Sequence, residues 1–236
     1  MSEDVFSILG DDKVAGVLRR LHAEADRQMP GLMLHYLPKL PRLLLGRALH
    51  FDEQESRGFY ADKYIALERE QAAFCHLTAR ALRARLVVEF GSSLGISTLW
   101  LAAAVRANGG GRVIGTEIVP EKAERARAHV EEAGLSEFVE IREGDALKTL
   151  RDLPKEVDLL LNDGFPNLAL EILQLVAPCM RPGAVVITDN VGTFKGNYRE
   201  YVEYLRNPAH GFCSTNVPFK SGTEYSVRTG PDSADT

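Results

Sequence analysis

The sequence contains little cysteine and no surplus of basic residues. Its three cysteines, Cys75, Cys179 and Cys213, are widely spaced and odd in number, without CxxC or metal-ligand spacing. They indicate buried thiols in a reducing compartment, so we expect a cytoplasmic protein. The formal net charge is −5, and no basic stripe is present, which argues against a nucleic-acid partner.

Long hydrophobic runs are also missing. No apolar stretch approaches the roughly 18 residues that a membrane span needs. The acidic N-terminus lacks the basic start and apolar core of a signal peptide. We therefore expect no membrane partner. The 236 residues are 45% hydrophobic and 26% charged, which is ordinary for a globular protein.

The first part of the chain carries helical signals. Apolar residues recur at helical spacing behind the capping candidates Asp11 and Asp12, and prolines at 30, 38 and 41 are expected to break the next stretch. A further helix is predicted over about 60–83, with one face made by Tyr64, Leu67, Phe74, Leu77 and Ala81. We divide the chain into a helical extension (1–59), a main domain (60–230) and a flexible tail (231–236).

From residue 86 onward, apolar strand candidates alternate with helix candidates. Strands are predicted at 86–90, 112–117, 139–143, 157–162 and 184–189, and helices near 96–107, 120–133, 145–152, 167–178 and 197–206. Two short β-runs, 213–219 and 224–228, are predicted to form a hairpin. Nearly unbroken apolar strands are covered on both faces, which predicts an α/β fold with a doubly wound, mostly parallel seven-stranded sheet.

The most informative segment runs from residue 86 to residue 97. A short strand ends in Glu89, and a small-residue loop from Gly91 to Gly95 leads into a helix. Glycine permits such a sharp turn and lets a ligand approach the backbone. Neither G-x-G-x-x-G nor a GxxxxGK[ST] phosphate loop is present. A second acid, Glu117, ends the next strand. Two acids at successive strand ends favour a ligand with hydroxyls and a positive charge over a pyrophosphate.

Further polar residues fall at the predicted strand ends, where doubly wound sheets bind their ligands. Any single acid among them could instead cap the helix that follows it, but the ordered set favours a binding site. The set comprises Glu89, Gly91, Ser92, Glu117, Asp145, Asp163, Asp189 and Asn190.

Over about residues 60–228 the chain resembles the class I S-adenosylmethionine (SAM)-dependent methyltransferases, most closely the metal-dependent small-molecule O-methyltransferases of the catechol and caffeoyl-CoA type. The matching residues are 88–91 (VEFG), Gly95, Ser97, 116–118 (TEI), 144–146 (GDA), 161–163 (LND) and 188–190 (TDN). The resemblance implies a Rossmann-like fold with SAM as cofactor. It implies cofactor contacts at Glu89, Gly91, Ser92, Ser97, Glu117, Ile118, Asp145, Ala146 and Asp163.

Three oxygen donors end the fourth and fifth predicted strands: Asp163, Asp189 and Asn190. Two carboxylates and a carboxamide are hard ligands that suit Mg²⁺, and this pattern resembles the metal-dependent enzymes specifically. The alternative is that the two segments are simple turns. A base-methylating motif is excluded at residues 162–165 because its prolines are absent.

One family feature is missing. Catechol-type enzymes have a lysine base three residues after the first metal aspartate, and this chain has Pro166 there. The resemblance makes Asp163 catalytic. Lys195 is one candidate for the base, although an exposed loop lysine is the favoured interpretation of this residue. The missing lysine weakens the inference of a catechol substrate.

The sequence therefore predicts a metal-dependent SAM O-methyltransferase that acts on a hydroxyl of a small phenolic or vicinal-diol molecule. Three alternatives stay open: a metal-independent N- or O-methyltransferase, a cofactor-binding subunit without activity, and a nucleotide-dependent dehydrogenase. The apolar stretch from Pro30 to Leu45 is expected to cover the acceptor pocket or to form a homodimer interface.

Overall fold

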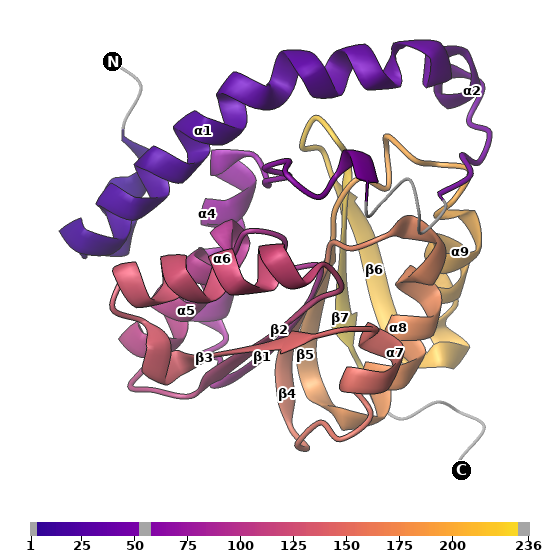
Figure 1. Ribbon diagram of the computed structural model, residues 1–236. Coiled ribbons are helices and arrows are strands. Elements are labelled where there is room, and N and C mark those ends of the chain that lie inside the picture. The colour runs from indigo at the N-terminus through magenta and orange to yellow at the C-terminus, as the bar shows by residue number, and fades with distance from the viewer. Residues whose placement is uncertain (1–3, 52–57, 231–236) are drawn as a thin grey trace.

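The computed structural model describes residues 4–51 and 58–230, so the expected tail at 231–236 lies outside the described residues. Its centre is a seven-stranded sheet with the order β3-β2-β1-β4-β5-β7-β6 (Figure 1). The first five strands run parallel, and β7 and β6 form an antiparallel hairpin at one edge. The predicted fold class is confirmed. The strands are β1 (Leu86–Phe90), β2 (Arg112–Glu117), β3 (Val139–Glu143), β4 (Val157–Asn162), β5 (Met180–Thr188), β6 (Phe212–Val217) and β7 (Thr223–Arg228).

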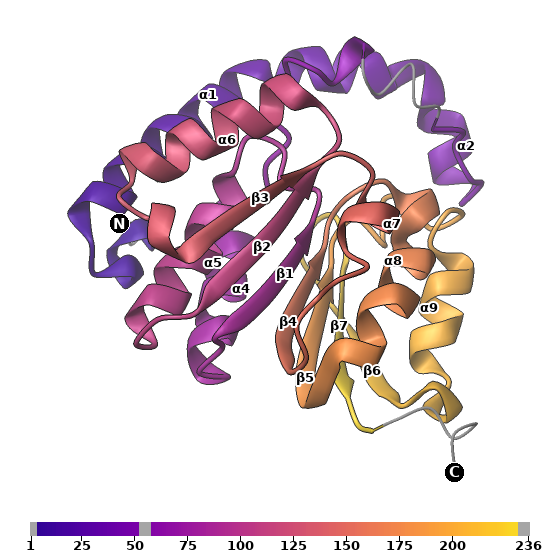
Figure 2. The same ribbon diagram turned by 60° about the horizontal axis from the view of Figure 1, so that its bottom comes forward.

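Helices cover both faces of the sheet (Figure 2). One face packs against α1, α4 and α5, and the other against α7, α8 and α9. Neighbouring strand residues alternate between the two cores, with Val87 in the first and Val88 in the second. The helices are α1 (Asp12–Tyr36), α2 (Leu40–Leu44), α4 (Arg69–Ala81), α5 (Ile96–Ala107), α6 (Pro120–Glu132), α7 (Ala146–Thr149), α8 (Ala169–Val176) and α9 (Arg199–Arg206). Short 3₁₀ turns lie at Val5–Leu9, Leu37–Lys39, Ser136–Phe138, Pro166–Leu168, Ala177–Cys179 and Pro208–His210.

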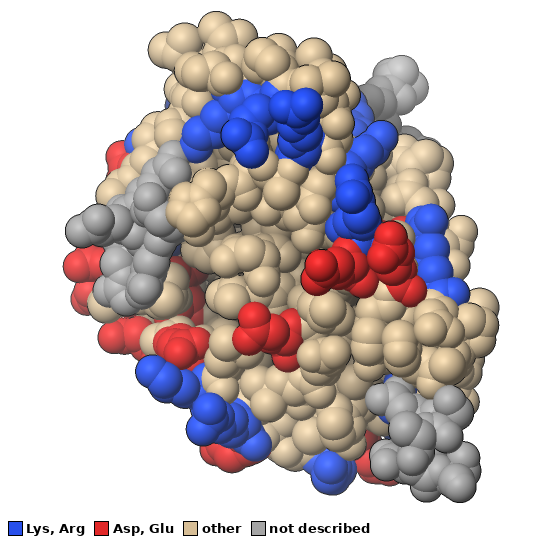
Figure 3. All heavy atoms as spheres, turned by 90° about the vertical axis from the view of Figure 1, so that its right-hand side faces the viewer, with Lys and Arg blue, Asp and Glu red and all other residues tan. Residues whose placement is uncertain are grey.

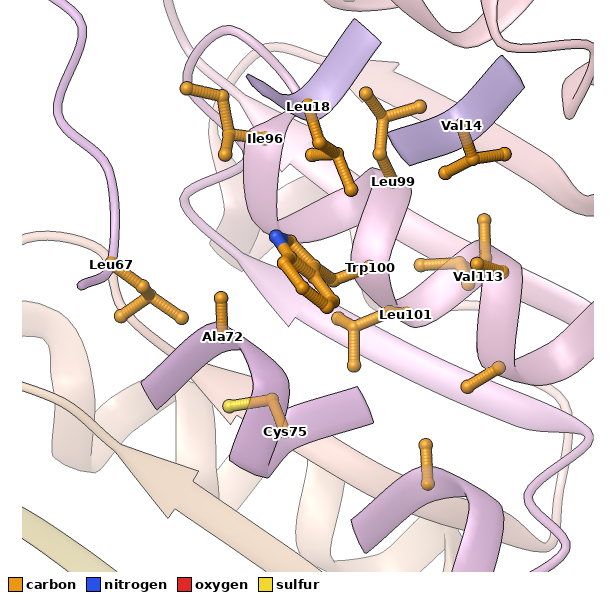
Figure 4. Close-up of a cluster of buried hydrophobic side chains, with 14 of the residues drawn as sticks. Val14, Leu18, Leu67, Ala72, Cys75, Ile96, Leu99, Trp100, Leu101 and Val113 are labelled. Carbon is orange, nitrogen blue, oxygen red and sulfur yellow. The ribbon is translucent and has the colours of Figure 1, made fainter. Parts of the chain in front are cut away.

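Helix α1 begins where the sequence predicts, because the Asp11 side chain accepts a hydrogen bond from the backbone N–H of Val14 at 2.9 Å. Its first half is part of the core: Val14, Leu18 and Leu21 are fully buried, and Leu18 lies beside Trp100 of α5 in the close-up of Figure 4. Its second half is largely exposed.

The expectation that Pro30 breaks this helix is wrong, since α1 continues to Tyr36. A proline inside a helix removes one hydrogen bond and crowds the carbonyl four residues earlier. Here that carbonyl belongs to Asp26, and both Pro30 and Asp26 are exposed. We attribute the tolerance to water, which can reach the carbonyl that loses its partner.

The predicted helix over 60–83 is also too long, because α4 begins only at Arg69. The backbone N–H of Tyr64 donates to the Gln28 side chain at 2.9 Å, which fixes this part of the chain outside a helix. Tyr64 and Leu67 are buried as expected, but Leu77 is exposed. The helix expected at 167–178 is shortened to α8 between two 3₁₀ turns, and β5 begins four residues earlier than predicted.

The order of the sheet reverses between β1 and β4, which lie side by side although six elements separate them in sequence. The chain leaves β1 toward α5 on one face and leaves β4 toward α8 on the other. The loops after these two strands therefore meet at the carboxyl end of the sheet, where the backbone N–H of Asp163 donates to the carbonyl of Phe90 at 3.0 Å. This is where open α/β sheets bind ligands. Among the described residues, no helix has the length and apolar character to cross a membrane.

Candidate active site

Two glycines allow the loop after β1 to lie directly against the loop after β4. Gly91 has a φ of 93°, which favours glycine. A Cβ atom at Gly91 would lie 2.7 Å from the Cα atom of Gly164 and 2.8 Å from the carbonyl oxygen of Asp163. A third glycine, Gly95, has a φ of 84° and begins α5. The loop thus presents bare backbone at the carboxyl end of the sheet, as its sequence predicts.

Glu89 ends β1 as a fully buried carboxyl group. Its Oε2 atom accepts hydrogen bonds from Ser92 Oγ, at 2.6 Å, and from Thr98 Oγ1. Burial raises the pKa of Glu89, while hydrogen bonds from Ser92, Ser97 and Thr98 lower it. Its Oε1 atom has no partner within the described part of the chain. A buried carboxylate oxygen without a donor is costly, so a ligand's N–H group would stabilise this atom. Glu89, Ser92 and Ser97 do not themselves line the cavities at the carboxyl end of the sheet.

Glu117 ends β2, the strand next to β1, and lines the cavity at the carboxyl end of the sheet. Its Oε1 atom accepts the backbone N–H of Val119 at 2.8 Å, and burial raises the pKa of the carboxyl group. Glu117 lines two adjoining cavities, so its carboxyl group faces the space where ligand hydroxyls could lie. The second cavity also contains Ile118, Asp145 and Ala146.

Asp145 has a structural role as well. Its side chain accepts the backbone N–H of Leu147 at 3.0 Å and caps α7. Capping is the simpler interpretation that the sequence left open. A cap and a cavity wall are compatible here, because the turn before α7 forms one end of the second cavity.

The three predicted metal ligands are brought together. Burial raises the pKa of Asp163 well above its ordinary value, and the nearby carboxylates of Asp189 and Glu89 raise it further. Asn190 donates to Asp189 Oδ2 at 2.9 Å, and Ser221 donates to Asp189 Oδ1 at 2.5 Å. Asn190 itself has a φ of 65°, an uncommon conformation that asparagine tolerates. A positive charge at this point would relieve the repulsion that Asp189 and Glu89 exert on Asp163.

The larger cavity has an aromatic wall that sequence reasoning missed. Asp163, Pro166 and Asn190 line it together with side chains from distant parts of the chain. We use the name aromatic wall for Tyr36, Phe51, Tyr60, Phe165, Phe194 and Tyr198. The rings of Phe51 and Phe194 meet edge to face at 5.4 Å. The hydroxyl groups of Tyr36 and Tyr60 are 2.6 Å apart.

Lys195 does not join this group. It is exposed and lines a separate hollow beside α9. Tyr198, by contrast, is fully buried and contacts the main cavity, and its hydroxyl makes no hydrogen bond with another described residue. Burial raises the pKa of Tyr198 well above its ordinary value, and the negative charge of Asp163 raises it further. Nothing in the sequence distinguished this tyrosine, because its neighbours come from other elements.

Residues 88–191 match the protein family described as "Methyltransferase domain". The chain contains a class I methyltransferase domain. This match covers the strands from β1 to β5 and includes every cofactor and metal residue predicted from the sequence. The resemblance to SAM-dependent methyltransferases is thereby confirmed, whereas the metal dependence stays a prediction.

Individual relatives support the same conclusion. A catechol O-methyltransferase from Mycobacterium tuberculosis is 38% identical over 128 residues, which are 54% of this chain and 57% of that protein. The aligned part thus spans little more than half the length of the relative.

Two solved structures also resemble this methyltransferase domain. An O-methyltransferase from Bacillus cereus in complex with SAH has a TM-score of 0.62 and 26% identity, covering 70% of this chain and 83% of the other. Cofactor-bound Rv0187 from MTB has a TM-score of 0.67 and 26% identity, covering 85% of this chain and 96% of the other.

The site's residues fit the cofactor that this domain implies. The partnerless Oε1 atom of Glu89 suits the amino group of the methionine part, and Glu117 suits the ribose hydroxyls. The donors also fit a divalent metal in kind, although no cluster of three His, Cys, Asp or Glu side chains among the described residues has a metal-binding arrangement. The predicted triad has only two carboxylates, so it depends on the Asn190 amide.

Proposed function

We propose that the protein is a SAM-dependent O-methyltransferase that acts on a hydroxyl of a small, flat aromatic molecule. The observation that carries this proposal is a cavity lined by two kinds of side chain. Glu117 and Asp163 line it together with the aromatic wall. The acids suit a sulfonium cofactor, and the rings suit an aromatic acceptor.

Methyl transfer from a sulfonium is an in-line displacement, and the main task of the chain is alignment. Glu89 and Glu117 fix two separate points of the cofactor. The aromatic wall holds the acceptor ring and excludes water, while the carboxylate of Asp163 balances the positive charge of the sulfonium before transfer. The proposal assigns no proton acceptor among the side chains, because Pro166 replaces the family lysine.

We further propose that Asp163, Asp189 and Asn190 hold a divalent cation, with Mg²⁺ the best match to their hard oxygens. When bound, the cation would supply Lewis-acid chemistry that lowers the pKa of a coordinated hydroxyl group. Pro166 favours a second candidate, a metal-independent N- or O-methyltransferase whose acceptor needs no base from the protein.

The test combines calorimetry with an activity screen. SAM, SAH and NAD⁺ are titrated into wild-type protein with and without Mg²⁺, and into Asp189→Ala. The matched control is Asp152→Ala, since the Asp152 side chain is 82% exposed and lines neither cavity. We expect SAM and SAH to bind, NAD⁺ not to bind, and a Mg²⁺ signal to vanish only in Asp189→Ala. Methylation of catechol-like phenols should stop on chelation.

Other outcomes separate the alternatives. SAM binding with chelator-resistant activity would favour the metal-independent enzyme. Binding of SAM and SAH without methylation of hydroxyl or amine acceptors would favour a cofactor-binding subunit. If neither SAM nor SAH binds, the proposed function is wrong.

A further inference from the structure

Lys122 is a buried ammonium group that the roles assigned above do not use. It lies in the first turn of α6, its residue is 4% exposed, and it lines the larger cavity beside Ser93 and Glu117. Within the described part of the chain, it is the one Lys or Arg side chain in that lining. Burying an ammonium group is costly unless the charge is paired.

The described residues satisfy Lys122 only in part. Its Nζ atom donates to Ser93 Oγ at 3.1 Å, but an ammonium group has three N–H donors. No carboxylate among the described residues forms an ion pair with it. Burial lowers the pKa of Lys122, and Glu117 raises it, yet one oxygen of Glu117 is already held by the backbone of Val119. Among the described residues, Glu117 and Asp62 thus act on the charge of Lys122 without forming a direct ion pair with it.

Its position indicates which kind of anion fits. Ser93 belongs to the loop between Gly91 and Gly95, which directly follows Glu89, the residue proposed to bind the methionine part of SAM. Lys122 follows Glu117 by five residues, and Glu117 is the proposed ribose ligand. The ammonium group thus lies between the loop proposed for the methionine part of SAM and the residue proposed for its ribose. The one anionic group that SAM carries is its carboxylate.

We propose that Lys122 and Ser93 form a carboxylate-binding subsite, and that its ligand is the carboxylate of the methionine part of SAM. This inference rests on the proposed function. It names a cofactor contact that the sequence motifs did not include. A carboxylate on the acceptor is the other source of the same chemistry, and the experiment distinguishes the two.

The test compares SAM with decarboxylated SAM, which lacks only the carboxylate, by calorimetry on wild type, Lys122→Met and Ser93→Ala. Methionine keeps most of the aliphatic stem of lysine and removes the charge. We expect Lys122→Met to weaken SAM binding by about 10- to 100-fold, the range for a hydrogen bond between charged groups. Affinity for decarboxylated SAM should change less than about twofold, and Ser93→Ala should show a smaller effect with the same selectivity. The matched control is Lys155→Met, on a lysine that is exposed and lies outside both cavities.

Equal weakening of both cofactors in Lys122→Met would overturn the inference, because the lysine would then support the fold or the ribose contact. Unchanged SAM affinity with a raised KM for a carboxylated phenol would also overturn it and would assign the subsite to the acceptor. If wild type binds neither SAM nor SAH, the proposed function fails first. Thermal unfolding of each variant shows whether a loss of binding reflects a loss of structure.

Discussion

At the scale of single residues, Gly91 has two separate reasons to be glycine. Its φ of 93° strains any other residue, and a Cβ atom would meet the backbone of Gly164. Gly109 has the same φ of 93°, but nothing lies within 4 Å of its would-be Cβ atom. The two positions therefore separate backbone strain from steric contact.

We expect the free energy of unfolding to fall further in Gly91→Ala than in Gly109→Ala, by more than about 1 kcal/mol. Both variants carry a backbone strain of roughly 1–2 kcal/mol, but only the alanine at position 91 also clashes with a neighbouring backbone. Gly91→Ala should also weaken SAM binding at least about tenfold, because the loops after β1 and β4 must move apart. Urea denaturation and calorimetry measure the two effects. Equal losses of stability would show that the contact with Gly164 is easily relieved.

His22 makes the stability of the protein depend on pH. It is 3% exposed, and its Nε2 atom accepts the indole N–H of Trp100 at 3.3 Å, so this nitrogen must carry no proton. Burial lowers the pKa of His22 from 6.5 to about 4, and Arg69 contributes to the same shift. The unfolded chain consequently binds a proton between these pH values that the folded chain excludes.

The stability that neutral His22 contributes is complete above pH 6.5 and falls as the pH is lowered toward 4, by at most about 3 kcal/mol. Glutamine can also accept the indole N–H and does not titrate, so His22→Gln should flatten this part of the profile. The measurement is the urea midpoint at successive pH values, with His50→Gln as a control at an exposed histidine. Parallel profiles for wild type and His22→Gln would contradict the prediction.

At the scale of elements, α1 has two halves with different roles. Leu18 in the first half is fully buried, whereas Leu34 in the second half is 69% exposed. We expect Leu18→Ala to cost about 2–5 kcal/mol in the free energy of unfolding. Leu34→Ala should change it by less than about 0.5 kcal/mol. Chemical denaturation compares the two, and similar costs would mean that the first half is not packed on α5.

The sequence predicted helices and strands well where a single local signal determines their position. Asp11 caps α1, and the run from Leu86 to Phe90 is a strand, because capping and apolar patterning act between near neighbours in the chain. The sequence prediction failed where a contact with a distant residue determines the start of a helix. Gln28 holds the backbone of Tyr64 outside a helix.

The site follows the same rule. Glu89 and Asp163 were found because strand ends can be read from the sequence, and parallel strands bring their ends together. Tyr198 and Lys122 were missed because their significance depends on a cavity formed by several elements. A buried lysine and an exposed one have the same letter in the sequence, and only the fold distinguishes Lys122 from Lys195.

At the scale of the whole molecule, a large apolar surface is exposed on the second half of α1 and on the segment around α2. Figure 3 shows a face of the molecule whose uppermost part carries neither acidic nor basic side chains. The exposed side chains are Met29, Met33, Leu34, Leu37, Leu40, Leu44 and Leu45. Apolar patches of this kind mark contacts with other molecules. Two predictions for the stretch from Pro30 to Leu45 therefore stay open: that it forms a homodimer interface, and that it covers the acceptor pocket.

We expect wild-type protein to have the mass of a dimer by light scattering at micromolar concentration, and the double variant Leu34→Glu with Leu44→Glu to be monomeric. Charged groups on this surface would be desolvated on association, which costs several kcal/mol. The control is Leu77→Glu, at an exposed leucine of α4. A monomeric wild type would leave the pocket cover as the remaining prediction for this stretch.

The aromatic wall and the acids at the strand ends come from different parts of the chain. Glu89, Glu117, Asp163 and Asp189 all lie within residues 88–191, whereas most of the wall lies before or after them. In the proposed function, changes in the flanking segments would therefore alter which acceptor fits without touching the groups proposed to hold the cofactor. Acceptor choice and cofactor binding would then be separable by mutation, although both use one cavity.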